Sequence, residues 1–214
     1  GPFSIETMAD LSRAARQAGM TPIVRVPELD YAAVTRPLDG GAQGIMVPRI
    51  THPDEVREAV TLMKYPPMGR RGSVLGRGHT QFRGGSLADT MEDANARSFL
   101  VVQVETREAL DHVDEIAAVR GVDAVLLGPT DLSVALGIPG KLTDPLLQGA
   151  IDRVLRACAA GGEVPAVHVN VLEQGEAWAQ RGMRMVSFSS EIALLSAASA
   201  ASVLALRKSF PSAP

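Results

Sequence analysis

The chain has 214 residues, which is enough for one globular domain with a sizeable core. Hydrophobic residues make up 46% and charged residues 21%, a balance typical of soluble globular proteins. The formal net charge is −3 and there is no long Lys/Arg block, which argues against nucleic acid or an anionic membrane as a partner. The single cysteine excludes an internal disulfide framework, so we expect a cytoplasmic protein.

Short apolar runs rich in β-branched residues alternate with helical stretches along the chain. We predict strands over residues 21–26, 44–48, 99–105, 124–128, 164–169 and 185–188. We predict helices over residues 5–17, about 53–64, 86–97, 107 to about 119, 146–160, 172–180 and 191–208, three of them capped by Ser4, Thr51 and Thr106. Strands that are short and nearly continuously apolar are typical of a parallel sheet buried on both faces.

The alternation of strands and helices predicts an α/β fold. We count about six strands, whereas a closed (β/α)₈ barrel has eight and typically about 250 residues. Residues 65–97 are one long interruption that begins with a segment rich in Pro and Gly, and such loops are usually functional or disordered. No linker divides the chain, so we predict a single domain over residues 1–214.

The most apolar run, Ile192–Leu206, lies near the end of the sequence and is rich in Ala and Ser. It is shorter than the roughly 20 residues that a membrane span needs. We therefore interpret it as part of a closely packed helix and expect no membrane partner.

Polar residues stand where the predicted strands end, which is where parallel α/β folds bind ligands. Gln103 and Glu105 end one strand and face the same side because they are two residues apart. Asp131 lies just beyond the next strand. Glu105 and Asp131 can therefore hold a hard divalent cation such as Mg²⁺ or Mn²⁺. The alternative is that both are acids that stabilise helix N-termini.

Two further features of these strand ends suit an anionic substrate. Arg25 lies in an apolar strand, where it can clamp a carboxylate or an enolate, or form a structural ion pair. The segment Gly128-Pro129-Thr130-Asp131 opens a helical turn whose free N–H groups suit a carboxylate, although many such turns bind nothing. No lysine ends a strand, so an aldolase of this sequence is expected to use a metal and not a Schiff base.

The histidines and the cysteine give weaker signals. His79 lies in the long loop and can reach a site, but a solvated loop histidine is the more ordinary interpretation. His168 ends a strand as either a ligand or a hydrogen-bonded core residue, and Cys158 is expected to be inert core.

Several segments in the same order resemble the HpcH/HpaI aldolase family, and the similarity runs from Gly1 to about Leu206. The matching segments are 21–27, 41–48, 64–72, 103–106 and 128–133. The resemblance implies a (β/α)₈ barrel that cleaves 4-hydroxy-2-oxo acids into a 2-oxo acid, typically pyruvate, and an aldehyde.

The resemblance also implies roles for the strand-end residues. Glu105 and Asp131 are implied ligands of Mg²⁺, Mn²⁺ or Co²⁺, and Gln103 supports the metal shell. Arg25 is implied to contact the keto oxygen and stabilise the enolate, while the turn from Gly128 through Asp131 holds the substrate carboxylate with its N–H groups. The resemblance also implies a homo-oligomer, a hexamer or trimer of dimers, because the family is known for oligomers that exchange a C-terminal helix, here at about 191–208.

One departure from the family pattern concerns its Asp-x-Glu-His motif, whose His takes part in proton transfer. In the family this motif runs directly into Gly-Pro-Phe, which here is Gly1-Pro2-Phe3. We therefore predict a barrel that is incomplete at the N-terminus, with two open edges and with inward residues such as Val24 and Phe188 short of neighbours. Two alternatives to an aldolase are a non-catalytic remnant that binds metal or a 2-oxo acid, and a citrate-lyase-type enzyme acting on CoA esters.

Overall fold

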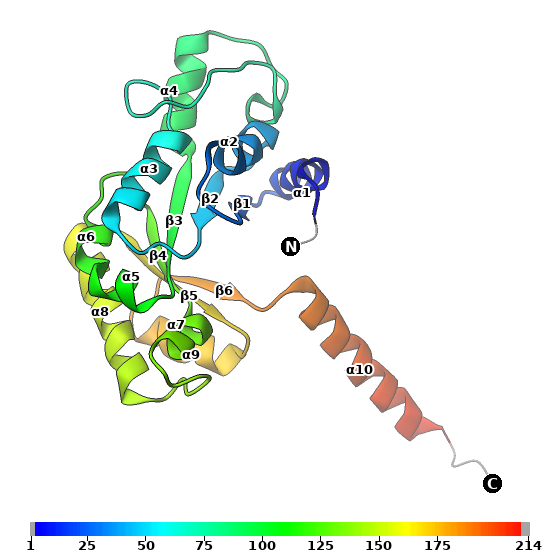
Figure 1. Ribbon diagram of the computed structural model, residues 1–214. Helices are drawn as coiled ribbons and strands as arrows, with labels where there is room; N and C mark the ends of the chain where they lie inside the picture. The colour runs from blue at the N-terminus through cyan, green and yellow to red at the C-terminus, as the bar shows by residue number, and fades with distance from the viewer. Residues whose placement is uncertain (1–2, 211–214) are drawn as a thin grey trace.

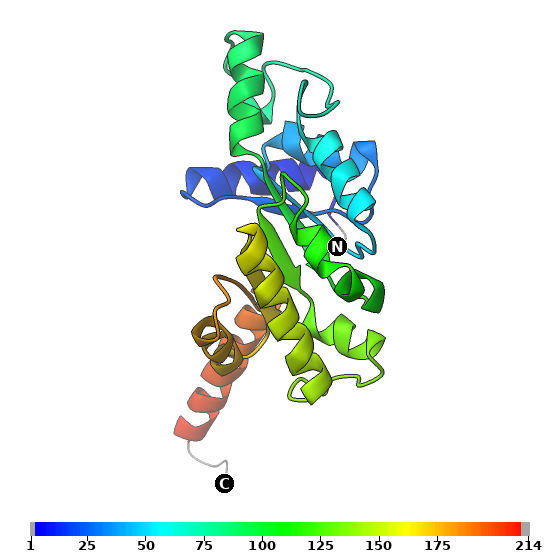
Figure 2. The same ribbon diagram turned by 90° about the vertical axis from the view of Figure 1, so that its left-hand side faces the viewer.

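The computed structural model describes residues 3–210, and its strands form one parallel sheet (Figures 1 and 2). Within the described chain there are six strands, paired in chain order. They are β1 (Ile23–Arg25), β2 (Gly44–Val47), β3 (Phe99–Val104), β4 (Ala124–Leu127), β5 (Val164–Val169) and β6 (Met185–Phe188). All lie within the predicted ranges. The sheet is a curled part of a barrel that ends at edge strands β1 and β6, so the predicted incomplete α/β barrel is confirmed.

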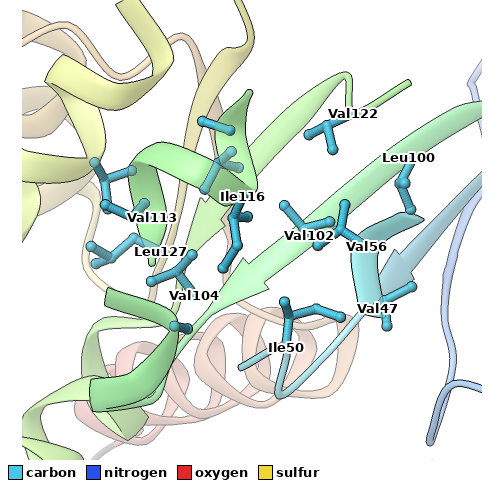
Figure 3. Packing of buried hydrophobic residues seen from close by; sticks show 14 of the residues in the cluster. Val47, Ile50, Val56, Leu100, Val102, Val104, Val113, Ile116, Val122 and Leu127 are labelled. Atoms are coloured by element: carbon cyan, nitrogen blue, oxygen red, sulfur yellow. The ribbon is translucent and has the colours of Figure 1, made fainter. Parts of the chain in front are cut away.

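Helices other than α10 lie along the sheet, and those on its outer side enclose the main hydrophobic core. The helices of the described chain are α1 (Ile5–Gln17), α2 (Tyr31–Gly40), α3 (Pro53–Met63), α4 (Leu87–Arg97), α5 (Arg107–Asp111), α6 (Val113–Ala117), α7 (Pro129–Ala135), α8 (Pro145–Gly161), α9 (Leu172–Gln180) and α10 (Glu191–Ser209), with the 3₁₀ turn η1 (Gly78–Thr80) in the long loop. Figure 3 shows Val102, Val104 and Leu127 of the sheet in one buried cluster with Val113 and Ile116 of α6.

The inner face of the sheet carries a second, smaller apolar cluster. Val101, Ala124, Leu126 and Ala166 form its buried part. Because side chains alternate along a strand, Gln103 and Glu105 lie on the same inner face as Val101, two and four residues farther on. The inner face is therefore apolar at the middle of the strands and polar at their carboxyl ends.

The helix α2 was not among the predicted helices, and the predicted helices differ from the structure at two places. The cap of α3 is His52 and not Thr51: its ring nitrogen accepts from the Asp54 N–H, and Glu55 completes a capping box. Thr51 instead donates to the Glu55 carboxylate. The helix predicted from residue 107 is broken at His112 into α5 and α6, although Thr106 caps it as expected.

The outer face near β6 is uncovered, and one predicted orientation is wrong. Val24 packs against the main core, and Phe188 pairs with the core residue Val169, so both lie on the outer face and not inward. Phe188 is 41% exposed. The helix that follows it, α10, extends away from the sheet and is exposed along its length (Figure 1). At 19 residues, α10 is longer than the run noted in the sequence and is apolar enough to span a membrane by length and composition alone.

Candidate active site

Glu105 is the centre of the polar group at the carboxyl ends of the strands. It immediately follows β3 and is 5% exposed. Each of its carboxylate oxygens accepts one hydrogen bond: Oε1 from the backbone N–H of Arg49 at 2.9 Å, and Oε2 from Nε2 of Gln103 at 2.6 Å. The two donors come from different strand ends, so they fix the orientation of the carboxylate.

A chain of hydrogen bonds connects Arg25 to this carboxylate. Arg25 Nε donates to Oε1 of Gln103 at 3.1 Å, and the Gln103 amide donates onward to Glu105. The amide orientation of Gln103 is thereby determined on both sides. Arg25 itself is exposed at the end of β1. Among the described residues Arg25 forms no ion pair, which removes the structural ion pair considered from the sequence.

Gly128 allows the end of β4 to approach this group closely. A Cβ at Gly128 would lie 3.0 Å from Gln103 Nε2 and 3.2 Å from Glu105 Oε2, both tighter than ordinary contacts. Helix α7 begins at Pro129, and no side chain caps its N-terminus, so the N–H groups of its first turn remain free on the side of the site. Thr130 and Asp131 in this turn are exposed.

The Glu105 and Asp131 side chains lie next to each other. Burial raises the pKa of the Glu105 carboxyl above its ordinary value, and the neighbouring Asp131 carboxyl raises it further, while the Arg49 N–H and the Arg25 guanidinium lower it. A divalent cation would relieve the repulsion between the two carboxylates, and oxygen ligands suit Mg²⁺ or Mn²⁺. Within residues 3–210 no third His, Cys, Asp or Glu joins the pair, so water and substrate would fill the other coordination positions.

Comparison with known proteins identifies the family. The chain matches the HpcH/HpaI aldolase/citrate lyase family over residues 3–198. The chain belongs to this family. The resemblance stated from the sequence motifs is therefore confirmed, and the two carboxylates lie in the barrel of an aldolase and lyase family.

Relatives in the family are similar over nearly the whole chain. The hydroxypyruvate/pyruvate aldolase of Delftia acidovorans is 34% identical over 203 residues, which cover 94% of this chain and 75% of that protein. The 4-hydroxy-2-oxo-heptane-1,7-dioate aldolase of Escherichia coli is 33% identical, with 96% and 78% covered. The crystal structure of an HpcH/HpaI aldolase from Desulfitobacterium hafniense has a TM-score of 0.91 at 35% identity, and the match covers all of this chain and 83% of that one.

The two histidines considered from the sequence lie in different places in this HpcH/HpaI chain. His168 is on the inner face, and its Nδ1 lies 2.9 Å from the Ser187 hydroxyl. His79 lies at the opposite, amino end of the sheet, where burial and the nearby Arg71 lower its pKa. His79 therefore does not reach the carboxylate pair.

Arg49 is a site residue that the sequence did not reveal. It directly follows β2, has a positive φ of 54°, and gives its backbone N–H to Glu105. Left-handed conformations are usual for glycine and asparagine, so an arginine gives no sequence signal for one.

Proposed function

We propose that this protein is a divalent-metal-dependent aldolase that cleaves or forms 4-hydroxy-2-oxo acids from a 2-oxo acid, such as pyruvate, and an aldehyde. The observation that carries the proposal is the buried Glu105 carboxylate beside Asp131, held by two donors at the carboxyl end of the barrel. The relatives named as aldolases of hydroxypyruvate, pyruvate and a hydroxy-oxo-dioate support this reaction class.

In this proposal Glu105 and Asp131 hold the cation, Mg²⁺, Mn²⁺ or Co²⁺, and Gln103 fixes Glu105. The cation, when bound, supplies Lewis-acid polarisation of the 2-oxo acid. The free N–H groups at the start of α7, from the turn Gly128–Asp131, bind the substrate carboxylate.

Arg25 is the residue that we assign to the reacting atoms. In cleavage, the C4 hydroxyl loses its proton, the C3–C4 bond breaks, and its electron pair forms the enolate of the 2-oxo acid. The Arg25 guanidinium, oriented by Gln103, donates to the enolate oxygen as negative charge develops there. Protonation of C3 then gives the 2-oxo acid, and the other product is the aldehyde. Among the described residues we assign none to the proton transfer.

The test is condensation of pyruvate with a short aldehyde, with added Mn²⁺ and after chelation. We expect a 4-hydroxy-2-oxo acid product that disappears on chelation and in Arg25→Ala. Metal binding without turnover of any aldehyde would identify a binding protein instead. Product formed only from CoA esters would identify a citrate-lyase-type enzyme.

We also propose that the protein is a homo-oligomer in which α10 packs on another copy, as in the hexamers implied by the resemblance. Val186 and Phe188 on the outer face of β6 are about 40% exposed, and α10 exposes Ile192, Leu195 and Leu206. These two apolar surfaces of the same chain complement each other between copies, whereas within one chain α10 leads away from β6 (Figure 1). A monomeric mass by light scattering, or recovery of the protein with sedimented lipid vesicles, would contradict this.

A further inference from the structure

The long loop at residues 65–97 has no part in the proposed reaction. It lies with α4 beyond the amino ends of the strands, at the opposite end of the sheet from Glu105 (Figure 1). Together with the end of α1 and the residues that precede β2 and β3, it encloses a cavity of about 340 Å³. Pockets of this size hold small organic molecules.

Contacts with α1 and α2 hold the loop in place around this cavity. Gly78 packs so closely on α2 that a Cβ there would clash with the carbonyl oxygen of Gly40. Arg16 of α1 donates from Nη1 to the carbonyl oxygen of Gly78 at 3.3 Å. The loop is therefore packed against two helices, and the cavity is a built feature of the fold.

Arg71 is a buried cation in the wall of the cavity, and one of its donors has no acceptor. The residue is 3% exposed, its Nη2 donates to the Asp39 carboxylate at 2.6 Å, and its guanidinium lies over the Tyr65 ring at 4.7 Å from the centroid. Its Nε has no hydrogen-bond partner among the residues that the structure describes. Burying an N–H without an acceptor costs free energy, so this donor indicates a ligand that accepts from it.

The lining of the cavity carries an excess of positive charge. It contains four arginines and two aspartates: Arg16, Arg71, Arg83, Arg97, Asp89 and Asp93. Arg71 and Arg97 each have a carboxylate partner already. Within residues 3–210, Arg16, Arg83 and Asp89 form no ion pair, so two free positive charges face one free negative charge. The cavity therefore favours an anion.

The N-terminus of α4 adds neutral donors at the edge of the cavity. Ser86, which lines the cavity, accepts from the Asp89 N–H at 3.3 Å and so caps the helix. In the described chain the N–H groups of Leu87 and Ala88 have no such cap. Free N–H groups at the start of a helix stabilise a bound anion.

This arrangement suits a phosphate better than a carboxylate. The donors come from α1, the loop and the start of α4, so they surround an anion from several directions. A phosphate monoester carries a charge of about −1.5 to −2 at neutral pH and three strong acceptor oxygens, which match several donors at once. The cavity has room for carbon atoms beyond the phosphate, and Asp89 and Thr90 in its lining can accept hydrogen bonds from hydroxyl groups there.

We propose that this cavity binds a small phosphate monoester of a polyol or sugar, with Arg16, Arg71 and Arg83 around the phosphate. The site is separate from the carboxylate pair at the other end of the sheet, and it does not depend on the proposed aldolase function. The bound ligand joins α1, the loop and α4, and so stabilises the amino end of the barrel.

The test is calorimetric titration of the metal-free protein with glycerol 3-phosphate at constant ionic strength. Glycerol lacks the phosphate, and succinate has a similar charge but only carboxylates. We expect one site per chain for glycerol 3-phosphate, at least about tenfold weaker binding of succinate, and no binding of glycerol.

Variants of two exposed arginines in the loop provide the matched comparison. Arg83 lines the cavity and has no ion pair in the described chain, so Arg83→Ala should fold normally and weaken glycerol 3-phosphate binding at least about tenfold. Arg77 does not line this cavity, and Arg77→Ala should bind as the wild type. Arg71→Lys keeps a cation beside Asp39 but loses the Nε donor, so it should also weaken binding.

Hydrogen–deuterium exchange locates the ligand. We expect glycerol 3-phosphate to protect residues 78–90, whereas protection of residues 128–133 would place the ligand at the carboxyl end of the barrel and overturn the proposal. Absence of glycerol 3-phosphate binding, or succinate binding as tight, would also overturn it. An equal effect of Arg77→Ala and Arg83→Ala would show a diffuse attraction of anions and no site. Each of these results leaves the aldolase proposal intact.

Discussion

Lys64 and Glu105 are buried charges at opposite ends of the same strand, β3. Lys64 Nζ donates to the backbone oxygens of Asn95 and Ser98 and to the Ser98 hydroxyl, at 2.7, 2.9 and 2.7 Å, and Ser98 immediately precedes β3. Glu105 immediately follows β3 and lies beside Asp131. Each side chain is 5% exposed.

Burial favours the neutral form of both groups, and the difference lies in their neighbours. Burial lowers the pKa of the Lys64 ammonium, and it raises the pKa of the Glu105 carboxyl. Three acceptors complete the hydrogen bonds of Lys64, so its charge ties the C-terminal end of α3 to the C-terminal end of α4. The neighbour of Glu105 is another carboxylate, so the Arg49 N–H and the Arg25 guanidinium compensate the negative charge there only in part. The amino end of the strand thus stabilises the fold, and the carboxyl end is left to a ligand.

Removing Lys64 should have the largest effect on stability. Lys64→Met leaves three buried acceptors without their donor, so we expect the free energy of unfolding to fall by about 3 kcal/mol or more. Urea unfolding of the metal-free protein measures this. A loss below about 1 kcal/mol would show that Lys64 is not a structural charge.

Removing the charge of Glu105 should raise the stability of the metal-free protein at neutral pH, whereas removing Lys64 lowers it. A carboxyl whose folded pKa is raised contributes stability below its unfolded pKa of 4.5, and this contribution is lost as the pH rises through the folded pKa. At neutral pH the ionised Glu105 therefore destabilises the metal-free fold. We expect Glu105→Gln to unfold at a higher urea concentration than the wild type near neutral pH, and the gain to shrink toward pH 4.5. A less stable variant at neutral pH would show that the neighbours of Glu105 compensate its charge fully in the metal-free fold.

Adding one methyl group at Gly128 should disturb the site with little effect on the fold. Its Cβ would press on Gln103 Nε2 and Glu105 Oε2. We expect Gly128→Ala to lower Mn²⁺ affinity by about tenfold, as loss of supporting contacts around a ligand does. The control is Gly149→Ala in α8, where nothing lies within 4 Å of the new Cβ and the affinity should stay unchanged. Equal affinities in the two variants would show that the close packing at Gly128 does not position Glu105.

The smallest expected effect concerns His79 at the amino end. Burial, and then Arg71, lower the pKa of its imidazole below 6.5. The neutral form is favoured in the fold, so its full contribution to stability is present above pH 6.5 and decreases as the pH falls below that value. We expect the wild type to lose more stability than His79→Phe between about pH 7.5 and about pH 5.5 in urea unfolding. Parallel losses would mean that His79 titrates as in the unfolded chain.

The sequence predicted every strand of the described chain, because short β-branched runs that follow a glycine or a polar stretch have few alternatives. It also brought Gln103 and Glu105 to one face through their two-residue spacing. Because side chains alternate along a strand, Val24 points to the face opposite Arg25 and therefore outward. The prediction that Val24 points inward did not take this alternation into account. The roles of the strand-end residues came from the family resemblance, since spacing alone also allowed helix-stabilising acids.

Other features depend on tertiary contacts that leave no mark on the local sequence. His52 caps α3 because Glu55 turns back to the backbone there, although Thr51 has the better intrinsic preference for a cap. The break at His112 divides a segment whose composition is helical throughout. The left-handed conformation of Arg49 accompanies a hydrogen bond from its backbone N–H to the carboxylate of Glu105, a residue 56 positions away.

Calorimetric titration of Mn²⁺ into the wild type and Glu105→Gln near neutral pH tests the central claim most directly. The claim is that Glu105 and Asp131 together hold a divalent cation. We predict one binding site per chain in the wild type, and loss of that site in the variant, because the amide removes the buried negative charge. Unchanged Mn²⁺ affinity in Glu105→Gln would contradict the assignment of this carboxylate pair as the metal centre.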